Sequence, residues 1–346
     1  MRETGGVSTE PKSTKPPIDP VRWQPPPVDP LPDLPSADLT VVKVPGNAPE
    51  DVVVDAEGAI WAGLDDGRIV RIAPGGGDPV VVATTEGRPL GLHVAHDGRI
   101  LVCTSPGGLL ALDPSSGTVQ TLVAEVDDRR LMFCSNVTQS PDDTIYFTES
   151  TSAFDYAHFK GAVMEARPRG SLFRRDADGT VLTAVAGLYF ANGVTPTADG
   201  SALVFAETMG RRLSKFWLTG ERAGSVTPLR ENLPGHPDNL STGADGRIWC
   251  AMVSPLNTAA EWLAPRWPAL RKLLWKLPDN LQPQIKPEVW AVAFDPDTGD
   301  VVAGIRCEHP HFGMVTGLVE SDGRLWMGSI GFPAVAHVDV ASLSIR

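Results

Sequence analysis

The sequence contains few cysteines, and none of them are close together. Its four cysteines form no CxxC pair, which argues against a structural zinc site. They could pair as disulfides in an oxidising compartment, but the sequence does not show it. We expect free, buried thiols at Cys103, Cys134, Cys250 and Cys307.

Long hydrophobic runs are also missing. No stretch of about 18 apolar residues is present, so no membrane-spanning helix is expected. The N-terminus shows neither a basic start followed by an apolar stretch nor a cleavage site, and we therefore expect a cytoplasmic location.

Basic residues are outnumbered, with 30 Lys and Arg against 42 Asp and Glu and a formal net charge of −12. A diffuse negative field opposes binding to nucleic acid or to an anionic membrane, since both favour a basic patch. No GxSxG elbow and no glycine-rich phosphate loop occur, which disfavours a serine hydrolase and a nucleotide-binding loop. The remaining partners are a small molecule or a cation.

Glycine and proline, in contrast, are abundant, at 34 and 32 residues. Ten of the prolines lie in the first 35 residues, which predicts a proline-rich N-terminal arm over residues 1–37, flexible at first and laid along the body near Trp23. Residues 38–346 are then expected to form one domain.

A repeated pattern runs through that domain. Each copy has a short strand, an acidic or Asp-Gly turn, and a second strand of alternating apolar and small residues, as in LSTGADGRIWCA. The copies occupy residues 52–63, 92–103, 137–148, 194–205, 240–251 and 318–328. Six copies of a four-stranded unit predict an all-β, six-bladed β-propeller. The strand at residues 39–44 is expected to pair into the final blade and close the ring.

The last spacing between turns is longer and holds an insertion at about residues 257–281. Leucines recur there at helical intervals with tryptophans between them, which predicts a helical insertion between the last blades. It could be a helix packed on the propeller, a lid over its mouth, or a hydrophobic surface for a membrane or partner.

The inner strand of each blade begins at the central channel, so we compare the residue eight positions before each turn glycine. We take the DDT turn of the third blade as one residue shorter, which selects Asn136 rather than Ser135. The six positions then read Glu50, Leu90, Asn136, Asn192, Asp238 and Val315.

Four of these positions carry oxygen ligands, and two of the four are carboxylates. Burying them together without a cation is costly. An all-oxygen set without Cys or His favours Ca²⁺, with Mg²⁺ or Mn²⁺ possible. The predicted metal ligands are Glu50, Asn136, Asn192 and Asp238, and Asn239 could supply a fifth. The alternative is that these side chains only satisfy backbone groups at the channel mouth.

The strings APEDVVVD, GRPLGLHV, FCSNV, IYFTES, FANGV, FWLTG and LPGHPDNL resemble the strictosidine synthase-like proteins. These are related to the calcium-dependent propellers that include regucalcin/gluconolactonase, paraoxonase and diisopropylfluorophosphatase. The resemblance covers about residues 38–340. It implies a six-bladed propeller with a central Ca²⁺ held by one Glu, two Asn and one Asp, which match the four ligands already named.

Two departures bear on the reaction. Strictosidine synthases carry a catalytic glutamate where this chain has Thr316, and the resemblance therefore does not extend to their condensation reaction. Paraoxonases place a histidine where this chain has Leu90, and His93 is expected to face another way, so a His–His dyad is not supported.

The function expected is metal-dependent hydrolysis of lactones, aryl esters or similar small hydrophobic substrates, with the metal as Lewis acid. Asp238 is the candidate nucleophile or general base. His236 is a candidate proton shuttle, or a loop histidine that shapes the turn. The candidate pocket residues are Leu90, His309, His311, Val315 and Thr316. A non-hydrolytic condensing or cyclising enzyme and a binding propeller with a structural metal remain alternatives, and the oligomeric state is open.

Overall fold

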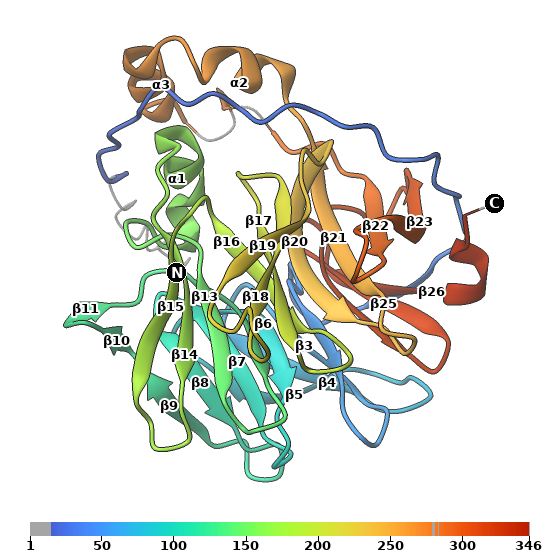
Figure 1. Ribbon diagram of the computed structural model, residues 1–346. Coiled ribbons are helices and arrows are strands. Elements are labelled where there is room, and N and C mark those ends of the chain that lie inside the picture. Colours follow the sequence, from blue (N-terminus) through green and yellow to red (C-terminus); the bar gives the residue numbers. More distant parts are fainter. Residues whose placement is uncertain (1–14, 279–280, 283, 346) are drawn as a thin grey trace, which may run out of the picture.

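The computed structural model describes residues 15–278, 281–282 and 284–345. Six four-stranded antiparallel sheets are arranged around a central axis, with helices gathered above one end of the ring (Figure 1). This confirms the all-β, six-bladed propeller. Each sheet is numbered below as a blade, and its first strand is the innermost.

The first three blades follow one another along the chain. Blade 1 consists of β2 (Val52–Val54), β3 (Ile60–Gly63), β4 (Arg68–Ile72) and β5 (Val80–Thr84). Blade 2 consists of β6 (Arg88–Val94), β7 (Ile100–Ser105), β8 (Gly108–Leu112) and β9 (Val119–Val123). A small hairpin of β10 (Glu125–Val126) and β11 (Arg129–Arg130) precedes blade 3, which consists of β12 (Cys134–Gln139), β13 (Ile145–Glu149), β14 (Gly170–Arg175) and β15 (Val181–Leu188).

The other three blades complete the ring. Blade 4 consists of β16 (Ala191–Pro196), β17 (Ala202–Glu207), β18 (Arg212–Trp217) and β19 (Val226–Arg230). Blade 5 consists of β20 (Gly235–Thr242), β21 (Ile248–Pro255), β22 (Val289–Phe294) and β23 (Val301–Cys307). Blade 6 consists of β24 (Val315–Ser321), β25 (Arg324–Ser329), β26 (Ala334–Asp339) and β1 (Thr40–Lys43), and a short 3₁₀ helix (Val340–Leu343) follows β26.

The ring is closed by pairing the first strand of the chain with the last. Strand β1 runs antiparallel to β26, with Thr40 opposite His337 and Lys43 opposite Ala334. The predicted closure by residues 39–44 is therefore confirmed. It pairs β26 on both sides and makes β1 the outer strand of blade 6.

Tight turns and packing between blades explain why this sequence forms the ring. The turn glycines of the repeat, such as Gly58 and Gly246, have positive φ values of 82° and 87°, which glycine adopts at little cost. The strands they connect bury large apolar side chains between neighbouring blades. Trp249, for example, lies in a cluster that joins blades 5 and 6.

The described α-helices lie in connections above the ring. The β13–β14 connection contains a 3₁₀ turn (Tyr156–His158) and α1 (Phe159–Glu165). The predicted insertion contains α2 (Thr258–Leu263) and α3 (Pro268–Trp275), and α3 packs against α1. Among the described residues, no helix has the length and apolar character needed to cross a bilayer.

The position of this insertion differs from the prediction. It connects β21 to β22 inside blade 5 and does not lie between the last blades. The spacing from one Asp-Gly turn to the next includes the outer half of a blade. A long spacing therefore shows that an insertion exists but not which connection carries it.

The described part of the arm, from residue 15 onward, crosses the ring without forming helix or strand (Figure 1). Trp23 donates its backbone N–H to the Ala264 carbonyl in the insertion at 3.2 Å. Further along, Asp29 N–H donates to the Asn232 carbonyl and Arg306 N–H donates to the Pro35 carbonyl. The arm thus connects the helices to blades 4 and 5 before it continues into β1. Residues 1–14 lie outside the described part.

Candidate functional site at the propeller axis

The inner strand of every blade is interrupted near its start. In blade 4, Ala191 pairs with Glu207 and Val194 pairs with Phe205, which leaves Asn192 and Gly193 in a two-residue bulge. Blades 2, 3, 5 and 6 have the same interruption, and in blade 1 two residues directly precede β2. The first residues of these pairs are Glu50, Leu90, Ser135, Asn192, Asp238 and Thr316. All six are buried.

The bulge corrects the prediction for blade 3. Its turn is not shorter, because Asp143 takes the glycine's place with a φ of 66° and donates its N–H to the Ser140 carbonyl. Gly200 makes the same bond to Thr197 in blade 4. Ser135 therefore occupies the position of Asn192, and choosing Asn136 was wrong. Aspartate tolerates the left-handed region well enough to replace the glycine that marks the turn elsewhere.

Blade 6 also differs from the prediction by one residue. The bulge contains Thr316 and Gly317, while Val315 pairs with Ser329 before it. Val315 is fully buried in the core between blades 5 and 6, so it does not line the axis. The hairpin here is tighter, because Asp322 and Gly323 both have positive φ values. Counting back eight residues from Gly323 therefore goes one residue too far and reaches Val315.

The second bulge residues alternate between polar residues and glycine. They are Asp51, Gly91, Asn136, Gly193, Asn239 and Gly317. A Cβ atom on Gly193 would lie 2.4 Å from the Leu240 nitrogen, and one on Gly317 would lie 2.2 Å from an Asp51 carboxylate oxygen. Glycine is thus required where a neighbouring blade approaches. Sequence comparison missed this second layer, although the alternation is visible once the bulges are aligned.

Two of the polar residues in this layer bond to the next blade. Asp51 accepts the Leu92 N–H at 2.9 Å, and Asn136 accepts the Val194 N–H at 3.1 Å. The Asn136 amide also donates to Asp51 at 3.4 Å. Asn136 therefore links blades 1, 3 and 4.

Three buried carboxyl groups lie close enough at the axis to affect one another. Burial raises the pKa of Glu50 well above its usual range, and the charges of Asp238 and Asp51 raise it further. Burial raises the pKa of Asp238 to about 8, with a contribution from Asp51. Burial also raises the pKa of Asp51 to about 7, against the bonds from Leu92 and Val52. These groups ionise fully at neutral pH only if positive charge lies near them.

Several oxygen atoms at the axis have no hydrogen-bond partner in the described part of the chain. They are Glu50 Oε2, Asp238 Oδ1 and Asn239 Oδ1. No three His, Cys, Asp or Glu side chains in the described residues form a metal cluster by themselves. A cation here would therefore need amide or hydroxyl oxygens as well. The unpaired, buried oxygens nevertheless fit one, because such atoms are costly without a partner.

Asn192 and Ser135 provide oxygens of that kind. Ser135 donates its hydroxyl to Asn192 Oδ1 at 3.1 Å, and the Asn192 amide donates to Thr208 Oγ1 at 3.1 Å. Thr208 in turn donates to the Pro237 carbonyl. These successive hydrogen bonds orient the Asn192 amide so that its oxygen, and not its nitrogen, faces Ser135.

An arginine and a tyrosine lie beside the carboxyl groups. The Arg88 guanidinium carbon lies 3.9 Å from the centre of the Tyr156 ring, and its charge partly offsets the rise in the pKa of Glu50. Burial raises the pKa of Tyr156 to about 12. Neither residue was identified from the sequence, because neither occupies a bulge.

His236 lies two residues before Asp238, in β20. Its Nδ1 atom lies 3.1 Å from the Ser254 hydroxyl. Burial and the nearby Arg211 lower the pKa of His236 to about 4, so the imidazole is neutral at neutral pH. A neutral imidazole can accept a proton, which keeps the proton-shuttle role open as a proposal.

His93 faces away from the axis, as expected. Its Nε2 atom accepts the Gln139 N–H of blade 3 at 3.3 Å, which requires a neutral ring. Burial, with a smaller contribution from His96, lowers the pKa of His93 from 6.5 to about 4.

This burial predicts a pH-dependent loss of stability. Below its ordinary pKa of 6.5 the unfolded chain binds a proton at His93 that the folded chain does not, until the pH falls through about 4. The free energy of unfolding should therefore fall by about 2 kcal/mol between neutral pH and about pH 5 through this residue alone.

Urea unfolding of His93→Gln at the two pH values checks this expectation. The pH-dependent loss should shrink by that amount, while the exposed His96→Gln should behave like the wild type. An unchanged pH dependence in His93→Gln would show that other groups cause it.

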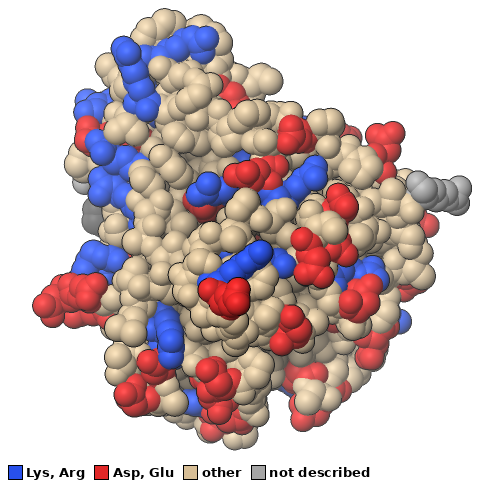
Figure 2. Space-filling model, viewed as in Figure 1, with Lys and Arg blue, Asp and Glu red and all other residues tan. Residues whose placement is uncertain are grey.

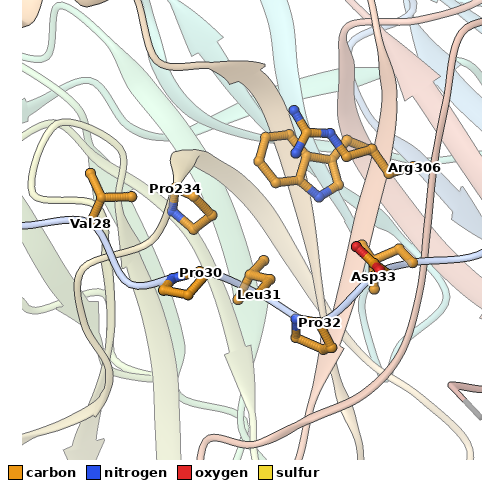
Figure 3. Close-up of a pocket in the computed structure, with 9 residues that line it drawn as sticks. Val28, Pro30, Leu31, Pro32, Asp33, Pro234 and Arg306 are labelled. Carbon is orange, nitrogen blue, oxygen red and sulfur yellow. The ribbon is translucent and has the colours of Figure 1, made fainter.

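His309 and His311 lie away from the axial site. His309 lines a groove of about 560 Å³ with arm residues Ser36 to Leu39, and its ring centre lies 6.2 Å from that of His311. A second groove, of about 610 Å³, lies between residues 28–34 of the arm and blade 5 (Figure 3). Both grooves border the arm, so the prediction that these histidines belong to an axial pocket gains no support.

Comparison with known proteins identifies the family. A model described as SMP-30/gluconolactonase/LRE-like region matches residues 64–260, more than half of the chain. A strictosidine synthase-like N-terminal model matches residues 33–72. Strictosidine synthase-like protein 4 of Arabidopsis thaliana is 29% identical over 303 residues, which cover 85% of this chain and 80% of that protein.

Solved structures share the fold. A gluconolactonase from Xanthomonas campestris superposes with a TM-score of 0.63 at 17% identity, over 94% of this chain and 98% of that one. The calcium-binding protein regucalcin from Agrobacterium tumefaciens superposes with a TM-score of 0.60 at 16% identity, over 88% and 93% of the two chains. Taken with the six blades and the polar axis, these matches show that the chain belongs to the SMP-30/gluconolactonase/LRE-like family of β-propellers, with a strictosidine synthase-like segment at residues 33–72.

Proposed function

We propose that the protein is a calcium-dependent hydrolase of lactones, aryl esters or similar small hydrophobic substrates, and that the reaction takes place at the axis. One observation carries the proposal: two buried carboxylate oxygens, Glu50 Oε2 and Asp238 Oδ1, have no hydrogen-bond partner among the described residues. Oxygen atoms of this kind favour a hard divalent cation. Regucalcin, a relative in fold, is described as calcium-binding.

The proposed ligands are Glu50, Asn192 and Asp238, with the Ser135 hydroxyl in the place predicted for Asn136. Asn239 can contribute its amide oxygen, since this buried atom has no hydrogen-bond partner among the described residues. Asn136 instead supports the site through Asp51 and Val194. The set contains only oxygen donors, which suits Ca²⁺ before Mg²⁺ or Mn²⁺.

A bound divalent ion would supply Lewis-acid polarisation of a substrate carbonyl or phosphoryl oxygen. Asp238 is the proposed nucleophile or general base, because its second oxygen can serve the reaction while the first holds the cation. Its pKa of about 8 without a cation means that the reactive carboxylate form depends on nearby positive charge. His236, neutral at neutral pH, is the proposed proton shuttle.

Two of the first bulge residues at the axis, Leu90 and Thr316, are less polar, and a hydrophobic substrate could contact them. Leu90 is fully buried. Thr316 donates its hydroxyl to the Glu50 carbonyl at 2.6 Å, so it fixes the backbone of a proposed ligand. The side chain at this position is therefore a hydroxyl and not a carboxylate.

The second candidate is a condensing or cyclising enzyme at the same axis. The similarity to strictosidine synthase-like protein 4 favours this reading. The threonine at position 316 weighs against it, because its hydroxyl cannot act as the acid or base that a carboxylate provides. A binding propeller with a structural metal is the third reading.

A panel of lactones and aryl esters, assayed with and without a chelator, tests the proposal. Turnover should disappear when the metal is removed and return with Ca²⁺, while Mg²⁺ should restore less. Stable Ca²⁺ binding without turnover on any member of the panel would contradict a hydrolase and favour the binding propeller. Turnover that resists complete removal of the metal would contradict calcium dependence.

A further inference from the structure

Helix α3 presents its apolar side outward. Leu270 and Leu273 are 37% and 60% exposed, whereas Arg271 on the inner side is only 5% exposed. A surface helix of a globular protein normally buries its leucines and exposes its cations. Leu270, Leu273 and Arg271 of α3 depart from this pattern. Lys272 and Trp275 follow it, because the lysine is exposed and the tryptophan is buried.

Polar bonds hold α3 in this orientation. Arg271 donates from Nη1 to the Met164 carbonyl at 2.9 Å and from Nη2 to the carbonyls of Ala264 and Val21. Trp275, also on the inner side, donates from its indole to the Pro16 carbonyl at 2.7 Å. Rotating the helix to bury its leucines would break these bonds, so the apolar face stays outward.

The neighbouring residues extend this apolar face. Trp262 and Trp267 are 52% and 49% exposed, and their ring centres lie 5.0 Å apart. Five of the eleven exposed large apolar side chains in the described chain fall within residues 262–281. We call these five the cap surface: Trp262, Trp267, Leu270, Leu273 and Leu281.

Cations border the cap surface. Arg266 lies over the Trp262 ring at 4.8 Å. Lys272 of α3 and Lys276, directly after the helix, are exposed. Lys272 also reaches Asp19 of the arm, at 3.5 Å. Between residues 258 and 278 the one acid is Glu261, and it pairs with Arg211 at 3.3 Å. Blue side chains accordingly gather over the helices in Figure 2, while red ones dominate the blades below.

We propose that the cap surface docks on an anionic phospholipid bilayer. Tryptophan suits the interface between headgroups and acyl chains because its ring is apolar and its indole N–H is polar. Leucines that enter the acyl boundary and lysines that meet anionic headgroups add to the binding energy. The overall charge of −12 does not prevent this, because the docking face carries the opposite sign.

The charge complementarity favours a lipid surface over a second copy of the chain. Another copy would place the same cations against each other across the two-fold axis of a dimer, which is unfavourable. An anionic bilayer meets both the apolar and the cationic parts of the cap surface.

Sedimentation with vesicles of phosphatidylcholine containing about a third phosphatidylserine tests the proposal. The wild type should bind, and its tryptophan fluorescence should shift to shorter wavelength. Leu273→Ser should bind about tenfold more weakly, and Lys272→Gln with Lys276→Gln should lose about as much. Matched controls are Leu182→Ser, which removes a leucine of similar exposure from β15, and Lys43→Gln in β1; both should bind like the wild type.

The other outcomes would overturn the proposal. They are absence of binding, equal binding to pure phosphatidylcholine, and equal loss in the control variants. A wild type that sediments as a dimer in analytical ultracentrifugation, with a monomeric Leu273→Ser, would instead assign the cap surface to self-association.

Discussion

Asp238→Asn should reduce turnover about 10³-fold or more while the propeller remains folded. The amide keeps one oxygen that can hold a cation, but it can act neither as nucleophile nor as general base. Asp238 is buried at the axis, and its Oδ1 atom has no hydrogen-bond partner in the described chain. Asparagine has nearly the same size, so the substitution changes charge without leaving a cavity. The measurement is kcat/KM on whichever lactone or aryl ester proves to be the best substrate.

Asp245→Asn is the matched control for this experiment. Asp245 lies in the β20–β21 turn of the same blade, where it is exposed and pairs with Arg247. This control should keep full activity. Wild-type activity in Asp238→Asn would exclude Asp238 from the reaction, and circular dichroism would show whether any loss comes from unfolding.

The second large effect concerns stability. Calcium at a hundredfold excess over its Kd should raise the free energy of unfolding by about 2.7 kcal/mol, because it binds the folded chain only. Glu50→Gln should abolish most of that gain. Without calcium the same variant should be more stable than the wild type, since it removes a buried acid that Asp238 and Asp51 disfavour.

Thermal unfolding with calcium and with chelator measures both effects: the stabilisation of the wild type by calcium and the higher stability of Glu50→Gln without it. Glu57→Gln, an exposed substitution in the β2–β3 turn of the same blade, should respond to calcium as the wild type does. A calcium response that survives in Glu50→Gln would remove Glu50 from the proposed ligands. Calcium stabilisation without any turnover would support the metal site and contradict the hydrolase.

The repeat was sufficient to predict the architecture. Hairpin turns are local, so a turn glycine marked all but one of the inner hairpins, and the alternating strands around them gave six blades and the closing strand β1. Glu50, Asn192 and Asp238 could be placed for the same reason, because each lies a constant distance from a turn glycine.

The errors came from places where that distance changes. Asp143 adopts the backbone conformation of the missing glycine, which shifted the choice from Ser135 to Asn136. The tighter hairpin of blade 6 shifted it from Thr316 to Val315. A bulge is defined by pairing between strands, and one strand read alone does not reveal it.

Contacts between distant segments were beyond the reach of the sequence pattern. Arg211 is an example, since it meets the carbonyl of Pro26 in the arm and the carboxylate of Glu261 in α2. Nothing in the local sequence around Arg211 indicates either partner. The inward orientation of Arg271 is a second example, because helical periodicity alone assigns the leucines of α3 to the buried side.

The closing strand has a consequence for how the protein is made. Among the described strands, β1 leaves the ribosome first and its partner β26 leaves last. Until then the outer edge of the future blade 6 is unavailable, and β1 has no partner for almost the whole time of synthesis. Contacts so distant in sequence form late. The ten prolines that precede β1 lack a backbone N–H, so they are poor partners for stray strands during this interval.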